Sequence, residues 1–304
     1  MKRIALVLNF LLLTLHFIAQ DVTVRTPAFR TQTTHAQFLG KSQPVRDARP
    51  MPQLGAKKEA WLKKQKMKPA NFPNRRGSNA IIAEREHQGP DPVRQFGGGQ
   101  TVVEPIVNID GIGDFGSPHD PSGDVGLEHY MQAVNVTEVG VYTKEGVLLD
   151  QFAMQTIWQG LGVQSAGDPI ILYDETAARW FVTEFTDPAN LLVAVSETSD
   201  PLGSYFAYSF STPEFPDYPK YAIWPNAYVV TTNESGAGIH TQYFIDRNAM
   251  LSGDNNVTIQ QVEIDGTSGS EQGFIVTTPV DWDGTALPIT NPMVLSLEDS
   301  SWGR

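Results

Sequence analysis

The sequence contains no cysteine. This absence excludes disulfide bonds, catalysis by a thiolate, zinc sites with cysteine ligands and a lipid-modified N-terminal cysteine. A chain of this composition must therefore take its stability from a buried core or from bound ions.

Basic residues are scarce in the larger part of the chain. Residues 101–304 contain 5 Lys+Arg against 28 Asp+Glu, a balance of −23, whereas residues 21–100 contain 15 against 6, a balance of +9. Binding to nucleic acid needs clustered Lys and Arg, so we do not expect it of the acidic part. The acidic excess fits three roles: solubility, sites for divalent cations, or repulsion of anionic partners.

Motifs of common catalytic centres are missing. There is no His-x-x-x-His pair, no Gly-x-Ser-x-Gly elbow and no glycine loop of the kind that holds phosphate. Residues 173–180 resemble the Asp-box turn of sialidases only loosely, because Asp174 and Trp180 are six residues apart rather than five. A sialidase also needs an arginine triad for its substrate carboxylate, and only three arginines follow residue 100, one of them at the last position. The sequence therefore indicates no catalytic residues.

The N-terminal 20 residues have the pattern of a secretory signal peptide. Lys2 and Arg3 precede residues 4–19, which are apolar apart from three positions. No later stretch approaches 18 apolar residues, so we expect a soluble mature chain without a transmembrane segment. The expected location is outside the cell or at its surface.

Residues 21–100 form a basic, proline-containing segment with few aliphatic pairs. We expect it to be a linker or irregular segment, with a possible short basic helix over residues 56–68; the alternative is an extended segment that must lie against something to be ordered. It could dock electrostatically on the acidic part, although salt screens such contacts, or it could anchor the protein on an anionic surface.

A repeat of about 50 residues organises the rest of the chain. Each of three copies begins with an Asp that lies beside a Pro or one residue before it. These residues are Asp120, Asp168 and Asp217, and they are 48 and 49 residues apart. An aromatic residue then opens a strand-like run in each copy. These aromatic residues, Tyr130, Trp180 and Tyr228, are spaced by 50 and 48 residues. A repeat of this length filled with short strands predicts an all-β fold, a β-propeller with blades of four strands.

The copy at residues 167–210 has the clearest strand pattern, with strands expected at 169–173, 179–185, 191–197 and 204–210. Strands of the neighbouring copies are expected at 129–135, 138–143, 147–152, 219–224, 227–232, 240–246 and 257–263, with a further strand-like run at 102–109. Residues 273–297 contain part of a fourth unit. Residues 101–304 thus predict three blades and part of a fourth, an incomplete ring in a fragment of a longer protein.

The repeated residues have two interpretations each. The aromatic residues are expected in the core between blades, or alternatively as a platform on which sugars stack. Asp120, Asp168 and Asp217, with Asp124, are candidate ligands of calcium, since a ring of carboxylates needs a cation or hydrogen-bond donors to relieve its repulsion. The alternative is that each Asp accepts hydrogen bonds within its own turn. Asp110 and Asp114 form a separate candidate, which lacks the final acidic ligand of an EF-hand loop.

Three runs carry a family resemblance: PHDPSGDVGLEHYMQAVN at 118–135, GDPIILYDETAARWFVTEF at 167–185, and FPDYPKYAIWPNAYVVTTN at 215–233. They resemble a group of large secreted bacterial proteins, propeller-like and mostly uncharacterised. Members often carry adhesive modules and a C-terminal secretion signal. The resemblance covers residues 109–297 and implies a fold, but no activity and no catalytic residues.

These observations together predict a secreted, non-catalytic propeller that binds an extracellular polymer or a cell-surface component. The alternative is an extracellular hydrolase of glycans or peptides whose active site is completed by further blades. The sequence does not decide whether the protein is an enzyme.

Overall fold

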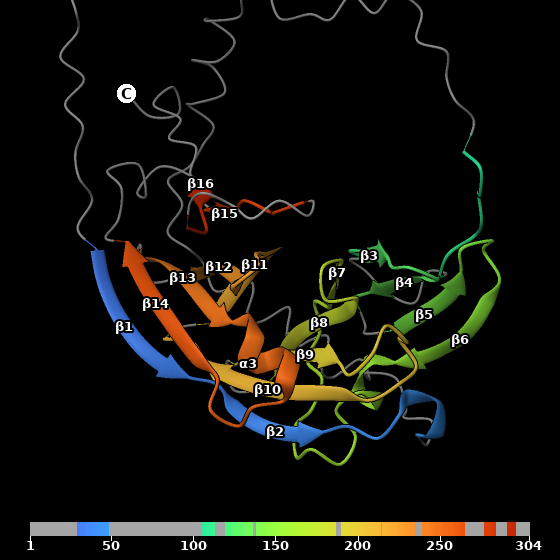
Figure 1. Ribbon diagram of the computed structural model, residues 1–304, viewed down its shortest axis with the longest axis horizontal. Coiled ribbons are helices and arrows are strands. Elements are labelled where there is room, and N and C mark those ends of the chain that lie inside the picture. Colours follow the sequence, from blue (N-terminus) through green and yellow to red (C-terminus); the bar gives the residue numbers. More distant parts are fainter. Residues whose placement is uncertain are drawn as a thin grey trace, which may run out of the picture.

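The computed structural model (Figure 1) describes residues 29–48, 105–112, 119–135, 138–186, 190–213, 215–234, 239–264, 277–283 and 291–295. This part of the chain is all-β and forms several antiparallel sheets, none of them closed into a barrel. The predicted fold class is confirmed at that level. Residues 1–20 and 56–68, the expected signal peptide and helix, lie outside the described residues.

The first sheet has the order β3-β4-β5-β6. Its strands are β3 (Ser122–Val125), β4 (His129–Val134), β5 (Glu138–Thr143) and β6 (Leu148–Ala153). The sequence predicted the last three, but not β3, which has a single aliphatic residue. A short 3-10 helix, η2 (Met154–Thr156), leads out of the sheet.

The second sheet contains the strands predicted for residues 167–210. They are β7 (Ile170–Asp174), β8 (Arg179–Thr186), β9 (Asn190–Ser196) and β10 (Tyr205–Ser211), joined as a four-stranded antiparallel meander. The prediction is confirmed to within two residues at each boundary. The reason is the regular spacing of β-branched and aromatic runs between turn residues.

The third sheet repeats this arrangement. Its strands are β11 (Pro216–Ile223), β12 (Ala227–Glu234), β13 (Ile239–Asp246) and β14 (Thr258–Ile264). A short helix that the sequence did not predict, α3 (Arg247–Ser252), connects β13 to β14. It begins at Asp246, whose side chain accepts a hydrogen bond from the Ala249 amide (3.0 Å), and ends at Gly253 in the left-handed conformation. A two-stranded sheet follows, formed by β15 (Thr278–Pro279) and β16 (Val294–Leu295).

The sheets are arranged in an arc. Figure 1 shows the first strands β3, β7 and β11 on its inner side, and the last strands β6, β10 and β14 on its outer side. The run expected at residues 102–109 is different: residues 105–109 form no strand, and Ile112 instead donates its backbone N–H to the Gln132 side chain (3.0 Å).

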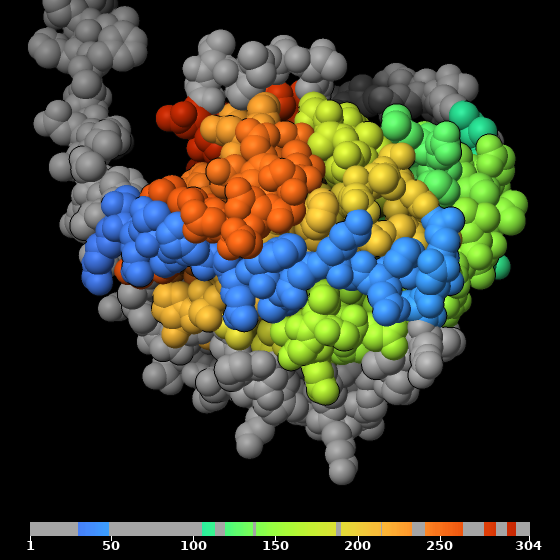
Figure 2. Space-filling view, turned by 60° about the horizontal axis from the view of Figure 1, so that its bottom comes forward, coloured from blue at the N-terminus to red at the C-terminus, as the bar shows by residue number. Residues whose placement is uncertain are grey.

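The N-terminal segment corrects the sequence analysis most clearly. β1 (Phe29–His35) pairs with β14, and β2 (Gln37–Lys41) pairs with β10, so each adds a fifth strand to the outer edge of a sheet. Figure 2 shows them as a blue band across the outside of the third and second sheets. A 3-10 helix, η1 (Val45–Asp47), ends the band. The prediction that residues 21–100 are an irregular linker is therefore wrong for residues 29–48, which we call the belt.

Sequence reasoning missed the belt because its strands are largely polar. Among the belt residues whose burial is described, only Ala36, Ser42 and Val45 are buried. Phe38 and Leu39 of β2 pack against the cores, but two adjacent apolar residues make no periodic pattern, and backbone pairing to β14 and β10 leaves none in the sequence.

Apolar cores fill the spaces between neighbouring sheets. Phe181, Tyr228 and Tyr243 belong to a cluster shared by the second and third sheets, and Trp180, Met131 and Tyr205 to one shared by the first and second. A smaller cluster around Trp224 lies between the third sheet and β15–β16.

The repeated aromatic residues follow the core interpretation at two of the three positions. Trp180 and Tyr228 have exposed fractions of 0% and 1%. Tyr130 is only half-buried, and its ring lies 5.7 Å from that of Tyr142 in its own sheet. Packing around Trp180 is tight: a Cβ on Gly126 would lie 2.8 Å from its ring, so only glycine fits in the β3–β4 turn.

No helix in the described residues is long and apolar enough to cross a membrane.

Candidate functional site

The repeat has a backbone signature at the start of each inner strand. Asp120, Asp168 and Tyr218 have φ of 39°, 55° and 53°, and each directly precedes a proline. A left-handed residue other than glycine is strained by roughly 1–3 kcal/mol, and a following proline disfavours it further. In the third copy the equivalent residue is Tyr218, so Asp217 lies one position away from the place that the sequence spacing assigned to it.

The carboxylates at these positions have local partners. Asn135 donates from its amide nitrogen to Asp120 (3.2 Å) and accepts through its amide oxygen from the backbone N–H of Asp168 (3.4 Å). Burial lowers the pKa of Lys220, and the nearby negative charges of Asp168 and Asp217 oppose that shift. Asp120 and Asp168 thus share one amide, and Asp168 and Asp217 lie near one cation.

Asp124 has a different role, which links two sheets. Its Oδ2 accepts from the backbone N–H of Tyr173 (2.7 Å), and Ser122 Oγ accepts from that of Ile171 (3.1 Å). β7 is the first strand of its sheet, so these N–H groups point away from β8 and would otherwise lack an acceptor in the sheet. Asp281 does the same for Ile223 of β11 (2.6 Å).

The four carboxylates predicted to bind calcium are therefore not gathered by the structure. Among the described residues, no three acidic or histidine side chains lie close enough together to hold a metal ion. Asp110 is described, but Asp114 lies outside the described residues. Calcium binding stays a prediction of the repeat pattern, for which the test is a higher thermal midpoint in millimolar calcium than in chelator.

The most strongly bonded polar group in the described structure joins the second and third sheets. Arg247 of α3 donates to both carboxylate oxygens of Asp174, from Nε to Oδ2 (2.6 Å) and from Nη2 to Oδ1 (2.7 Å), and the Tyr228 hydroxyl donates to Oδ2 (2.8 Å). Asp174 is fully buried and Arg247 almost so. We call these three residues the clamp.

The charge state of the clamp follows from its contacts. Burial of the Asp174 carboxyl would raise its pKa, but the hydrogen bonds and positive charge of Arg247, with the Tyr228 hydroxyl, outweigh burial and lower the pKa. Burial and the neighbouring carboxylate raise the pKa of Tyr228, which stays protonated as a donor. Sequence analysis considered Asp174 only as part of an Asp-box. The signal that could have identified the clamp is the scarcity of basic residues. Arg247 is one of only 5 Lys+Arg in residues 101–304, so it was a candidate partner for a buried carboxylate.

A second buried carboxylate fixes the connector between the first and second sheets. Glu184 of β8 accepts hydrogen bonds from Trp158 Nε1 and Ser165 Oγ, and it is 1% exposed. Both donors lie in the connector between η2 and β7. Glu184 thus ties this connector to the second sheet away from solvent.

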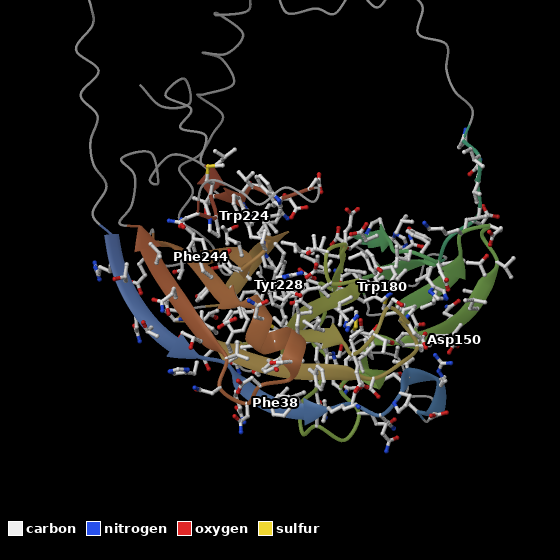
Figure 3. All side chains as sticks on the ribbon, in the orientation of Figure 1. Phe38, Asp150, Trp180, Trp224, Tyr228 and Phe244 are labelled. Atoms are coloured by element: carbon white, nitrogen blue, oxygen red, sulfur yellow. The ribbon has the colours of Figure 1, made fainter. Side chains whose placement is uncertain are left out.

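The accessible candidate site is a pocket on the third sheet. Its volume is about 540 Å³, within the range usual for ligand pockets. It is open to solvent, and residues from β13, α3, β14, the β11–β12 turn and the stretch before β16 line it: Asn226, Ala227, Phe244, Ile245, Asp246, Asn248, Thr258, Gln260, Asn291 and Pro292. Figure 3 shows Phe244 on the same side of the molecule as Trp224. The sequence did not predict this pocket, because its residues come from distant parts of the third unit and from the stretch before β16, and they share no motif.

Comparisons of this chain with protein families, curated proteins and solved structures find no match.

Proposed function

We propose that this chain is a secreted, non-catalytic β-propeller that acts as a binding or scaffold module at the cell surface or on extracellular polymers. The proposal has three parts, the propeller, the location and the absence of catalysis, each with its own support.

The recurrence of one unit supports the propeller. Each of the three sheets has its four sequential strands in meander order, with the first strand on the inside of the arc and the last on the outside. A left-handed residue followed by a proline stands directly before β3 and β7 and within β11, and cores fill the spaces between sheets. β15 and β16 continue the series as part of a fourth blade, in a ring that these blades leave incomplete.

The N-terminal 20 residues and the three resembling runs support a location outside the cell. The acidic balance of residues 101–304 keeps such a module soluble and repels anionic partners.

The chemistry of the pocket carries the non-catalytic part. Among the described residues, its lining contains one carboxylate, Asp246, which caps α3, and no histidine, lysine or arginine. Glycoside hydrolysis ordinarily uses two facing carboxylates, and acyl transfer uses a nucleophile beside a base. The buried carboxylates Asp174 and Glu184 do not face solvent: Asp174 joins two sheets through Arg247, and Glu184 holds the connector between β6 and β7.

The experiment is to incubate the full chain with insoluble polysaccharides and with casein, and to measure both adsorption and product release. We expect adsorption to polymer without new reducing ends or peptides. Product release that falls on the substitution Asp246→Asn, which preserves the helix cap, would show a hydrolase instead.

A further inference from the structure

We propose that the pocket on the third sheet binds a neutral carbohydrate chain, an inference that rests on the proposed binding function. The lining residues set out above point to this class of ligand through their hydrogen-bonding groups, their aromatic ring and their charge.

Amide and hydroxyl groups dominate the polar lining. Asn226, Asn248, Gln260 and Asn291 each have an exposed side-chain amide, and Thr258 adds a hydroxyl. An amide group both donates and accepts, as does each hydroxyl of a sugar, so the two sets of groups match without any change of protonation. The Gln260 amide oxygen already accepts from Thr33 Oγ1 of the belt (3.1 Å), and its NH₂ group donates no hydrogen bond in that contact.

Phe244 provides the apolar part of the site. It is partly buried, because it packs against the cluster that contains Trp224, and it also lines the pocket. The C–H groups of a pyranose ring form a flat apolar face that fits against an aromatic ring. The aromatic ring can thus contact the C–H groups of a sugar, while the neighbouring amides bond to its hydroxyl groups.

Charge selects neutral chains over acidic ones. Asp246 is the only ionisable side chain among the described lining residues, and residues 101–304 as a whole have a balance of −23. A uronate or a sulfated sugar would enter this field without a cation to meet it.

A peptide fits the pocket less well than a carbohydrate. Pockets that recognise peptide side chains offer apolar subsites, but the aliphatic lining residues Ala227 and Ile245 are 6% and 1% exposed. Of the apolar side chains among the described lining residues, only Phe244 and Pro292 are partly exposed.

The test is native affinity electrophoresis of the full chain in gels that contain dextran, xylan, glucomannan or a β-1,3-glucan, with alginate as the anionic comparison. We expect at least one neutral polysaccharide to slow migration, and alginate to have no effect. The double variant Asn226→Ala/Asn248→Ala should bind the retarding polysaccharide about tenfold more weakly, because it loses two amide partners.

Two further variants make the result specific. Asn256→Ala is the matched control, since Asn256 is an exposed amide on the connection between α3 and β14 that does not line the pocket. It should bind as the native chain does. Phe244→Leu keeps an apolar side chain against Trp224 but removes the ring, so it should weaken binding while the thermal midpoint changes little.

The outcomes separate the ligand class from the proposed function. If no neutral polysaccharide slows the chain, or if the double variant binds as tightly as the native chain, the carbohydrate assignment is overturned. The native chain and the Asn256→Ala control could instead bind alginate or a casein digest that the double variant does not bind. That result would also overturn the carbohydrate assignment, but it would leave a binding function in place. Release of reducing ends in the gel would contradict the non-catalytic proposal, even if the ligand class holds.

Discussion

Trp180 contributes to the core more than any other repeated residue of the second sheet. Its ring is fully buried, lies 4.8 Å from that of Tyr173 in an edge-on contact, and donates from Nε1 to the Ser199 carbonyl (3.1 Å). The substitution Trp180→Ala removes these contacts and leaves a cavity, so we expect the free energy of unfolding to fall by about 3–5 kcal/mol.

Urea denaturation measures the effect of Trp180→Ala. The control is Leu127→Ala, at a side chain that is 63% exposed, which should change the free energy by less than about 0.5 kcal/mol. Equal effects of the two substitutions would show that Trp180 is not part of a packed core.

The clamp predicts a dependence of stability on pH. Asp174→Asn leaves Arg247 buried without a counter-charge, and breaking such a pair costs about 3–5 kcal/mol at neutral pH. Because the pKa of Asp174 is lowered in the folded chain, its contribution is complete above the pKa of the unfolded chain, about 3.9, and is lost as pH falls through the folded value.

Urea unfolding of the native chain and of Asp174→Asn at pH 7 and at pH 3 tests this. The difference between the two should shrink on acidification, because below about pH 3.9 the unfolded native chain takes up a proton at Asp174, whereas the variant has no carboxyl there to protonate. A difference that is the same at both pH values would contradict an ionised Asp174 in the fold.

At the scale of elements, the belt joins two sheets at a single buried residue. Ala36 lies between β1 and β2, is 5% exposed, and donates its N–H to the Val257 carbonyl (3.0 Å). Ala36→Glu would bury a charge there, so we expect the belt to detach and residues 29–48 to become cleavable by trypsin at Arg30 and Lys41.

Gln37→Glu is the control for this substitution. It places the same side chain one residue later, where the native one is exposed, and should leave the belt as resistant as in the native chain. Equal cleavage of both variants would mean that charge alone, and not burial at Ala36, controls docking.

The strands that sequence reasoning located are those with an apolar pattern. β8 and β9 are buried along nearly their whole length and are bounded by turn residues, and their predicted and observed bounds agree closely. β3 has too few apolar residues to be recognised, and β1 and β2 are held by pairing to strands far away in the sequence. The hydrophobic pattern within one segment does not show pairing with a strand that is distant in the sequence.

The candidate site was hidden from the sequence for a similar reason. The sequence singled out Asp124 and Asp168 as candidate calcium ligands, which stays a prediction, whereas their observed partners Tyr173 and Asn135 are determined by contact between neighbouring sheets. The clamp and the pocket also bring together residues from separate strands and α3. Spacing within one repeat therefore predicted where polar residues recur, but not what they bind.

At the scale of the whole molecule, the belt, the clamp and the cores make three sheets one body. The belt crosses the outside of two sheets, the clamp joins the same two, and Val45 of η1 reaches the core shared with the first sheet. The pocket depends on this arrangement, since Gln260 lies on β14, the strand that β1 covers.

Hydrogen exchange of the full chain, followed by mass spectrometry, tests the integral belt most directly. Backbone amides that are paired in a stable sheet exchange only on opening of that sheet. We predict that the paired amides of β1 and β2 exchange as slowly as those of their partners β14 and β10. Exchange of residues 29–41 at the rate of an unstructured peptide, with β10 and β14 still protected, would contradict the account.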